Sequence, residues 1–309
     1  MMKKHKLTGA IGVGAIAMLA LAGCASDSDT DGGDAGSGSG LPGDGKTVTL
    51  GYIPSWTDGL SVSYLMKDQL EKLGYEVDME EITEAGVLFT GVANGDIDIF
   101  PSAWPEVTHK SYMEKYGDDL EQLGTYYDGA VLTIAVPEYM DDINSIEDLE
   151  GQADRFDGKI IGIEPSAGLT EAAEAMIPEY GLDDEYELQT SSTAAMLTTL
   201  GDAVDKEEDI VVTLWRPFWA NDAYPVKDLE DPKGAMGTPE GLGAVATAGW
   251  ADENPEAAEL IKGFVLDDEE YGSLEDTVVN KYEDDKDKTE AIEEWIAANP
   301  EAFDTELAD

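Results

Sequence analysis

Short runs in which apolar and polar positions alternate recur from residue 47 onward, separated by longer segments with apolar residues at helical spacing. Period-two alternation predicts strands, and a repeat of three to four residues predicts amphipathic helices. The first series of strands reads VTLGYI, YEVDMEEI and IDIF, and the helices between and after them are expected at 58–73, 86–94 and 105–116. These elements form a first α/β unit.

A second series of the same kind follows further along the chain. Its expected elements are a strand AVLTIAV, a short helix SIEDLE, a strand KIIGIE, a helix at 168–180, a strand YELQTS, a helix at 193–204 and a strand DIVVTLW. Ser191 or Ser192 supplies an N-cap for the helix at 193–204. Strands that alternate with helices predict parallel sheets, so the chain is expected to hold two α/β units.

The remainder begins with the apolar run GAVATAGW and continues as three helical segments, NPEAAELIKGFV, EEYGSLEDTVV and TEAIEEWIAA. Three helices without strands cannot build a third sheet, so we expect them to cover the first unit. The fold class is therefore α/β with two lobes and two crossing segments, near 133–137 and 243–247. Residues 47–134 and 243–309 are assigned to lobe 1 and residues 135–242 to lobe 2, with a ligand cleft between them.

The N-terminus has the pattern of a secretory signal. Three lysines lie within residues 1–6, a short apolar stretch covers 10–22, and LAGC ends at Cys24. This end resembles the lipobox of bacterial lipoproteins, in which residues 1–23 would be removed and Cys24 lipidated. Residues 24–46, rich in Gly, Ser and Asp, are expected to form a flexible tether. The resemblance implies an extracytoplasmic protein anchored to the cell membrane by its lipid.

The charge balance narrows the range of partners. Acidic residues number 68 against 18 lysines and arginines, for a formal net charge of −50. Nucleic-acid binding needs clustered basic residues, and the chain has only two arginines, Arg155 and Arg216, so a nucleic-acid partner is excluded. Acidic runs such as DDEE at 267–270 are interpreted as solvated faces, and such a surface also suits a salty habitat.

Three of the six tryptophans occupy equivalent positions. Trp56, Trp104 and Trp215 each lie near the carboxyl end of a predicted strand, the edge at which open α/β sheets bind ligands. A single tryptophan there is most simply a core residue, whereas three from both lobes predict an aromatic box. Such a box suits a quaternary ammonium group, with up to about 2 kcal/mol from each desolvated ring. Trp295, inside an amphipathic helix, is interpreted as packing.

Several segments carry a specific resemblance: GYIPSW, GVANGDIDIFPSAWPEVTHKSYMEKY, IIGIEPSAGL, STAAMLTTL and IVVTLWRPFW. Together they resemble the glycine betaine and proline betaine substrate-binding proteins of ABC importers, which have a two-lobed type II periplasmic-binding-protein fold. The resemblance implies that Trp56, Trp104 and Trp215 enclose the trimethylammonium group. It also implies that the Gly162 and Ile163 amides and His109 bind the carboxylate, that the partners are an ABC permease and its ATPase, and that no cofactor is needed. A monomer is expected.

The residues agree with these implied roles. KIIGIEPSAGL is a strand running into a helix, and backbone N–H groups near a helix start favour an anion. His109 can add a donor without a permanent charge, although a histidine on a helix surface is the plainer alternative. Phe218 stands where related sequences often carry histidine, so the choice among betaines is expected to differ accordingly. Separately, choline, carnitine or dimethylsulfoniopropionate remain alternative ligands.

Other function classes find less support. An enzyme would need a nucleophile and a base, but no G-x-S-x-G turn is present and His109 is the only histidine beyond the signal. A metal centre would have to use carboxylates alone, and no D-x-D-x-D-G loop occurs. A signalling or adhesive lipoprotein that meets another protein stays open as a third class.

Overall fold

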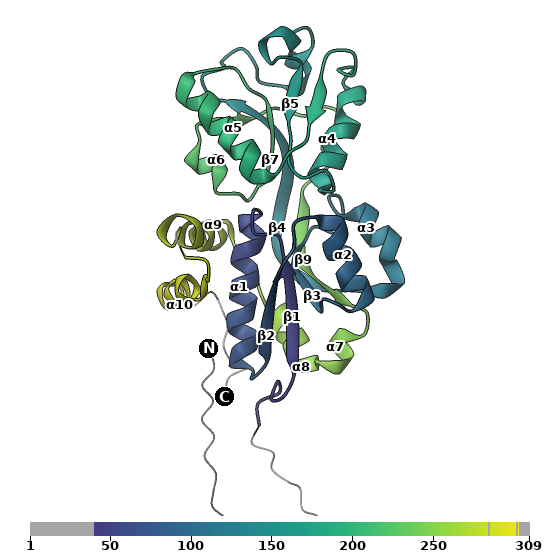
Figure 1. Cartoon of the computed structure of the whole chain (residues 1–309), viewed down its shortest axis with the longest axis vertical. Helices are drawn as coiled ribbons and strands as arrows, with labels where there is room; N and C mark the ends of the chain where they lie inside the picture. Colours follow the sequence, from purple (N-terminus) through teal and green to yellow (C-terminus); the bar gives the residue numbers. More distant parts are fainter. Residues whose placement is uncertain (1–39, 284, 301, 303–309) are drawn as a thin grey trace, which may run out of the picture. The chain divides into compact units, whose positions relative to one another are not determined.

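A computed structural model describes residues 40–283, 285–300 and 302 (Figure 1). Gly40 begins one compact unit. The predicted signal peptide, the first part of the tether and the lipidation site Cys24 lie outside the described residues. Within the described ranges, no helix combines the length and apolar character needed to cross a bilayer.

The first of two connected sheets contains the amino-terminal strands. Its order is β2-β1-β3-β9-β4, with β1 parallel to β2 and β3, and β9 antiparallel to β3 and β4. The strands are β1 (Thr47–Tyr52), β2 (Glu76–Glu81), β3 (Ile99–Ala103), β9 (Glu240–Thr247) and the first part of β4 (Leu120–Pro137). We call this sheet, with the helices that cover it, the first lobe.

The second sheet, with its helices, forms the second lobe. Its order from β4 is β4-β7-β5-β6, and β8 pairs with the end of β4. β5 runs parallel to β6 and β7, whereas β7 and β8 are antiparallel to β4. The strands are β5 (Lys159–Ile161), β6 (Glu187–Gln189), β7 (Val212–Arg216) and β8 (Val226–Asp228). The two lobes confirm the predicted α/β, type II architecture.

A single long strand joins the two lobes. β4 pairs with β9 up to Ala130 and with β7 from Val131 onward, so it changes partners in mid-strand. Only its second part, AVLTIAV, was expected from the sequence. The first part has three register shifts opposite β9, and Gly124 and Gly129 have positive φ angles. These bulges interrupt the alternation by which a strand is recognised in a sequence. The predicted residue boundaries of the lobes stay a prediction.

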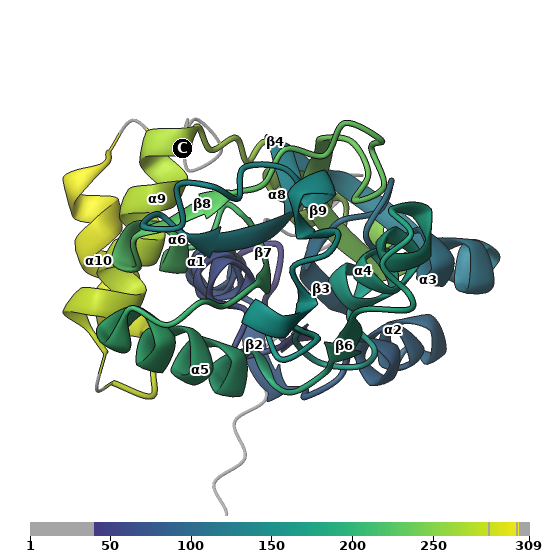
Figure 2. The same ribbon diagram turned by 90° about the horizontal axis from the view of Figure 1, so that it is seen from above.

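Helices cover both faces of the first sheet. α1 (Thr57–Lys72) contacts β1, β2 and β3, while α2 (Ala85–Asn94) contacts β3 and β9. α9 (Asp268–Asp276) and α10 (Thr289–Ala298) pack beside α1, and α3 (Lys110–Tyr116) lies with α2 on the other side (Figures 1 and 2). α8 (Pro255–Lys262) contacts β4, and α7 (Trp250–Glu253) precedes it. A π-helical turn, Thr277–Lys281, continues α9.

The second sheet is covered by α4 (Gly168–Glu179), α5 (Thr193–Lys206) and the short α6 (Ala220–Ala223). Ser192 is the N-cap of α5, because its hydroxyl accepts a hydrogen bond from the Ala195 amide. The predicted short helix SIEDLE is a 3₁₀ turn over Ile146–Leu149, with one more at Ala153–Arg155 and another at Gly117–Asp119 in the first lobe. Apolar side chains of both lobes join in one buried cluster that includes Leu50, Ile134 and Val212.

Candidate functional site

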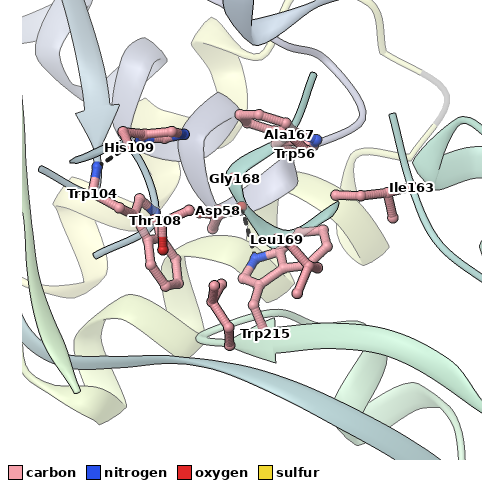
Figure 3. Close-up of a pocket in the computed structure, with 11 residues that line it drawn as sticks. Trp56, Asp58, Trp104, Thr108, His109, Ile163, Ala167, Gly168, Leu169 and Trp215 are labelled. Atoms are coloured by element: carbon pink, nitrogen blue, oxygen red, sulfur yellow. Dashed lines mark hydrogen bonds between the residues drawn. The ribbon is translucent and has the colours of Figure 1, made fainter. Parts of the chain in front are cut away.

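A cavity of about 30 Å³ lies between the two lobes (Figure 3). The first lobe contributes the segments that follow β1 and β3. The second lobe contributes the segment after β5, the start of α4 and the end of β7. The lining residues are Trp56, Asp58, Trp104, Thr108, His109, Leu132, Ile163, Ala167, Gly168, Leu169 and Trp215.

All the predicted ligand-binding residues except Gly162 line this cavity. Trp104 and Trp215 are each 5% exposed and His109 is 2% exposed, whereas Trp56 is half-buried. The three indoles lie around one space, although Trp215 is the penultimate residue of β7 rather than a residue beyond it (Figure 3). The structure therefore brings these side chains together, and their contact with a ligand stays a prediction.

The spacing between Trp104 and His109 has a structural reason. The Trp104 amide donates to Nδ1 of His109 over 2.9 Å, and the His109 amide donates to the Trp104 carbonyl over 2.7 Å. These two reciprocal hydrogen bonds close the segment 104–109 into a ring. The helix predicted from Pro105 therefore begins only at Lys110, because the residues before it form this closed turn.

A buried carboxylate from β9 holds the same turn. Oε2 of Glu240 accepts hydrogen bonds from the amides of Glu106 (3.0 Å) and Val107 (2.8 Å). Its Oε1 accepts from the amide and the hydroxyl of Thr108, at 2.9 and 2.5 Å. Glu240 is 3% exposed, so these four charge-assisted bonds form away from solvent. They fix the turn that carries Trp104 and His109.

The hydrogen bond at Nδ1 decides the protonation of His109. Burial lowers the pKa of His109 to about 3, so the imidazole is neutral at physiological pH. Because Nδ1 accepts a hydrogen bond, the ring proton must be on Nε2. Nε2 is buried and has no partner among the described residues. The cavity wall thus contains a neutral N–H donor without an acceptor, and a ligand oxygen would satisfy it.

The Trp215 side of the cavity contains an acid that the sequence analysis missed. The Trp215 indole N–H donates to Oδ1 of Asp58 over 3.3 Å, and its ring stacks on Phe218 with 3.9 Å between centroids. Burial raises the pKa of Asp58 to about 7. Hydrogen bonds from Gly59 and Trp215 lower this pKa, but by less than burial raises it. The signal available in the sequence was weak, since an acid in the first turn of a helix is common.

The two predicted backbone donors have different surroundings. The Gly162 amide donates to the Gln189 carbonyl over 2.9 Å. The Ile163 amide, by contrast, has no acceptor within the part of the chain that is described, and Ile163 lines the cavity. α4 begins at Gly168 in the same wall, so the positive end of its dipole lies at the cavity. The role of Gly162 as a carboxylate donor stays a prediction and would require exchange of its bond to Gln189.

Comparison with known proteins places this site in a family. Residues 46–298 match the family described as the substrate binding domain of ABC-type glycine betaine transport system, OpuAC. The chain belongs to the OpuAC family. It is a substrate-binding protein of the ABC-type glycine betaine transport family.

Relatives and solved structures agree with the OpuAC assignment. Lactococcal OpuAC, in its closed conformation complexed with glycine betaine, is 33% identical, with a TM-score of 0.76 over 84% of this chain and 98% of that one. The glycine betaine and L-proline binding protein ProX of Borrelia burgdorferi is 30% identical, with a TM-score of 0.77 over 83% and 95%. The glycine betaine/carnitine transport binding protein GbuC of Listeria monocytogenes is 36% identical, but the match spans only 46% of each chain.

Metal ligation is a separate question for this OpuAC-family protein. No group of three or more His, Cys, Asp or Glu side chains that could hold a metal ion occurs among the described residues. The donors in the cavity wall are instead an imidazole N–H and backbone amides, and the lining side chains include a single carboxylate, Asp58. This set of groups suits an organic ion with an apolar, positively charged end.

Proposed function

We propose that this protein binds glycine betaine, or a closely related quaternary ammonium carboxylate, between its lobes and delivers it to an ABC importer. The observation that carries the proposal is the buried Nε2–H donor of His109, which has no partner among the described residues and belongs to a side chain that lines a cavity shared with three indoles. A betaine has a methylated cation at one end and a carboxylate at the other. The indoles suit the first and the Nε2–H donor suits the second.

The aromatic side of the site accounts for the cation. A trimethylammonium group has no N–H to donate, so the negative faces of Trp56, Trp104 and Trp215 are suitable partners. With up to about 2 kcal/mol from each desolvated ring, three rings supply much of the roughly 8 kcal/mol that micromolar binding requires. The cost of immobilising the ligand is subtracted from that sum.

The arrangement of the lobes supports a closing mechanism. Trp56, Trp104 and His109 come from the first lobe, whereas Ile163 and Trp215 come from the second. Only a closed protein completes the site, so a ligand that contacts both lobes stabilises the closed form. In the proposed cycle, the closed protein presents both lobes to the permease.

The proposed location is outside the cytoplasm, with the protein held at the membrane by a lipid on Cys24. This part of the proposal rests on the lipobox pattern Leu21-Ala22-Gly23-Cys24 and on family relatives that are named as periplasmic binding proteins, such as OusX of Dickeya dadantii, which is 24% identical. Metabolic labelling with a fatty acid would test it, with Cys24→Ser as the unlabelled control.

Choline is a second candidate, favoured by one observation. The carboxyl group of Asp58 lines the cavity, and an anion there suits a ligand with net positive charge. Choline lacks the carboxylate that the His109 donor would bind.

Calorimetric titration of the wild type and His109→Ala with glycine betaine and with choline tests the proposal. We expect the substitution to weaken glycine betaine binding by about 1 to 3 kcal/mol, because a hydrogen bond to a charged group is lost. Choline, which shares the cation, should be affected much less and serves as the control for a distorted box. Equal losses for both ligands, or tighter wild-type binding of choline, would contradict the betaine assignment.

A further inference from the structure

Glu164 is a buried acid that does not line the cavity but touches one of its walls. It lies between β5 and α4, is 5% exposed, and accepts four hydrogen bonds. Oε1 accepts from the Ser55 hydroxyl (3.2 Å) and the Thr193 amide (3.0 Å). Oε2 accepts from the Trp56 indole N–H (3.2 Å) and the Thr193 hydroxyl (2.8 Å).

These four donors come from two lobes. Thr193 is the first residue of α5, so it belongs to the second lobe, as Glu164 does. The amide and hydroxyl of Thr193, together with the positive end of the α5 dipole, orient the carboxylate from within that lobe. Ser55 and Trp56 follow β1 in the first lobe. Each carboxylate oxygen of Glu164 therefore accepts one hydrogen bond from the first lobe.

The bond to Glu164 sets the orientation of the Trp56 indole. The ring of Trp56 stacks on His109 with 6.1 Å between centroids and 19° between planes. If the ring turned about its side-chain torsions, the indole N–H would lose its acceptor and the stacking would be lost as well. An unpaired donor at a half-buried position costs free energy, so the bond restricts the ring to one orientation.

We propose that Glu164 is a positioning residue that fixes Trp56 as a wall of the ligand cavity when the two lobes meet. Closure of the lobes and completion of the aromatic wall then occur as one event, because the acceptor and the indole belong to different lobes. This inference rests on the proposed function, in which the cavity takes a quaternary ammonium ligand.

The chemistry of the four donors provides a sharp test. Each carboxylate oxygen receives one hydroxyl, which can reverse and become an acceptor, and one N–H group, which cannot. In Glu164→Gln, the new NH₂ group must face either the Thr193 amide or the Trp56 indole N–H. Trp56→Phe removes the indole N–H and keeps an aromatic ring, so the glutamine can then turn its NH₂ away from Thr193 without conflict.

The experiment is a double-mutant cycle measured by calorimetric titration with glycine betaine. We expect Glu164→Gln to weaken binding about tenfold in the wild type, because a fixed donor loses its acceptor. Trp56→Phe is expected to weaken binding by about the same factor. In the Trp56→Phe background, Glu164→Gln should weaken binding by no more than about a further twofold, because the glutamine NH₂ group no longer faces a fixed N–H donor.

Glu171→Gln is the matched control. Glu171 is an exposed residue of α4 that accepts a hydrogen bond across the lobes from the Ser111 hydroxyl over 2.9 Å, away from the cavity. The same substitution there should leave binding within about twofold. Thermal unfolding without ligand shows whether each variant is folded.

Three outcomes separate the inference from the proposed function. If the wild type binds glycine betaine and Glu164→Gln weakens binding equally in both backgrounds, Glu164 only supports the start of α5 and the positioning role is wrong. The same conclusion follows if Glu164→Gln binds as tightly as the wild type. If the wild type binds no quaternary ammonium compound at all, the proposed function is wrong, whatever the variants do.

Discussion

At the scale of single residues, Asp58 is the group through which ligand binding in the cavity is expected to depend on pH. The residue is 3% exposed, and burial raises its pKa to about 7. Glu275 is a second buried acid, and burial, followed by the charge of Asp58, raises its pKa to about 8. A bound cation favours the charged form of a neighbouring carboxylate, so ligand binding should lower the pKa of Asp58.

The sign of the pH effect follows from this shift. At pH 6 the free protein holds a proton on Asp58 that must leave when the cation binds, whereas at pH 8 the group is largely ionised already. We expect affinity for glycine betaine to rise from pH 6 to pH 8, by at most about tenfold over this range. Titration in buffers of different ionisation enthalpy would count the protons released.

Asp58→Asn is the control for this prediction, because the amide does not titrate. The variant should bind with nearly constant affinity across the same pH range. A wild-type profile that is flat, or one that falls with pH, would show that Asp58 does not sense the bound cation.

At the scale of elements, the start of α4 lies against the turn that carries Trp104 and His109. A Cβ atom placed on Gly168 would lie 1.9 Å from the Thr108 carbonyl oxygen, which is a backbone atom of the opposite lobe. The helix can approach the turn this closely only because residue 168 has no side chain. Gly168→Ala should therefore keep the lobes from closing fully.

We expect Gly168→Ala to weaken glycine betaine binding by about 1 to 3 kcal/mol, the usual range for an overpacked contact. Small-angle scattering should show that the wild type contracts on binding and that the variant contracts less. Gly272→Ala, in α9 with no atom within 4 Å of the added Cβ, is the matched control. Unchanged affinity in Gly168→Ala would mean that the lobes do not need this contact.

At the scale of the whole molecule, the net charge is expected to make the stability of the fold depend on salt. A formal charge of −50 on 309 residues makes the folded chain repel itself more strongly than the expanded unfolded chain does. Salt shortens the range of this repulsion, from about 10 Å at 0.1 M to about 3 Å at 1 M. We expect the melting temperature to rise by several degrees between 0.1 and 1 M KCl, at roughly 2 to 4 °C per kcal/mol.

Sucrose provides the comparison for the salt experiment. It stabilises folded proteins by exclusion from their surface and does not screen charge, so KCl should stabilise more at equal osmolarity. Equal melting temperatures at low and high salt would remove the hypothesis of a protein adapted to a salty habitat.

Local patterns were sufficient for many elements. The run TEAIEEWIAA was expected to be helical and corresponds to α10 over the same residues, Thr289–Ala298. Here apolar spacing and helix-forming residues agree with the tertiary environment. The first part of β4 was missed because its bulges disturb the alternation, and the helix predicted from Pro105 was wrong over its first residues. That turn is held by Glu240, which lies 132 residues beyond Thr108 in the sequence.

The sequence alone determined the α/β class, the two-lobed organisation and the residue types that could enclose a methylated cation, because these depend on periodicity and on positions along each strand. Only the tertiary structure decided which nitrogen of His109 carries the proton and that Ile163, but not Gly162, lines the cavity. It alone revealed Asp58 and Glu164 as partners of two tryptophans. Each of these features depends on hydrogen bonds or packing between segments brought together by folding, and local sequence patterns do not encode such contacts.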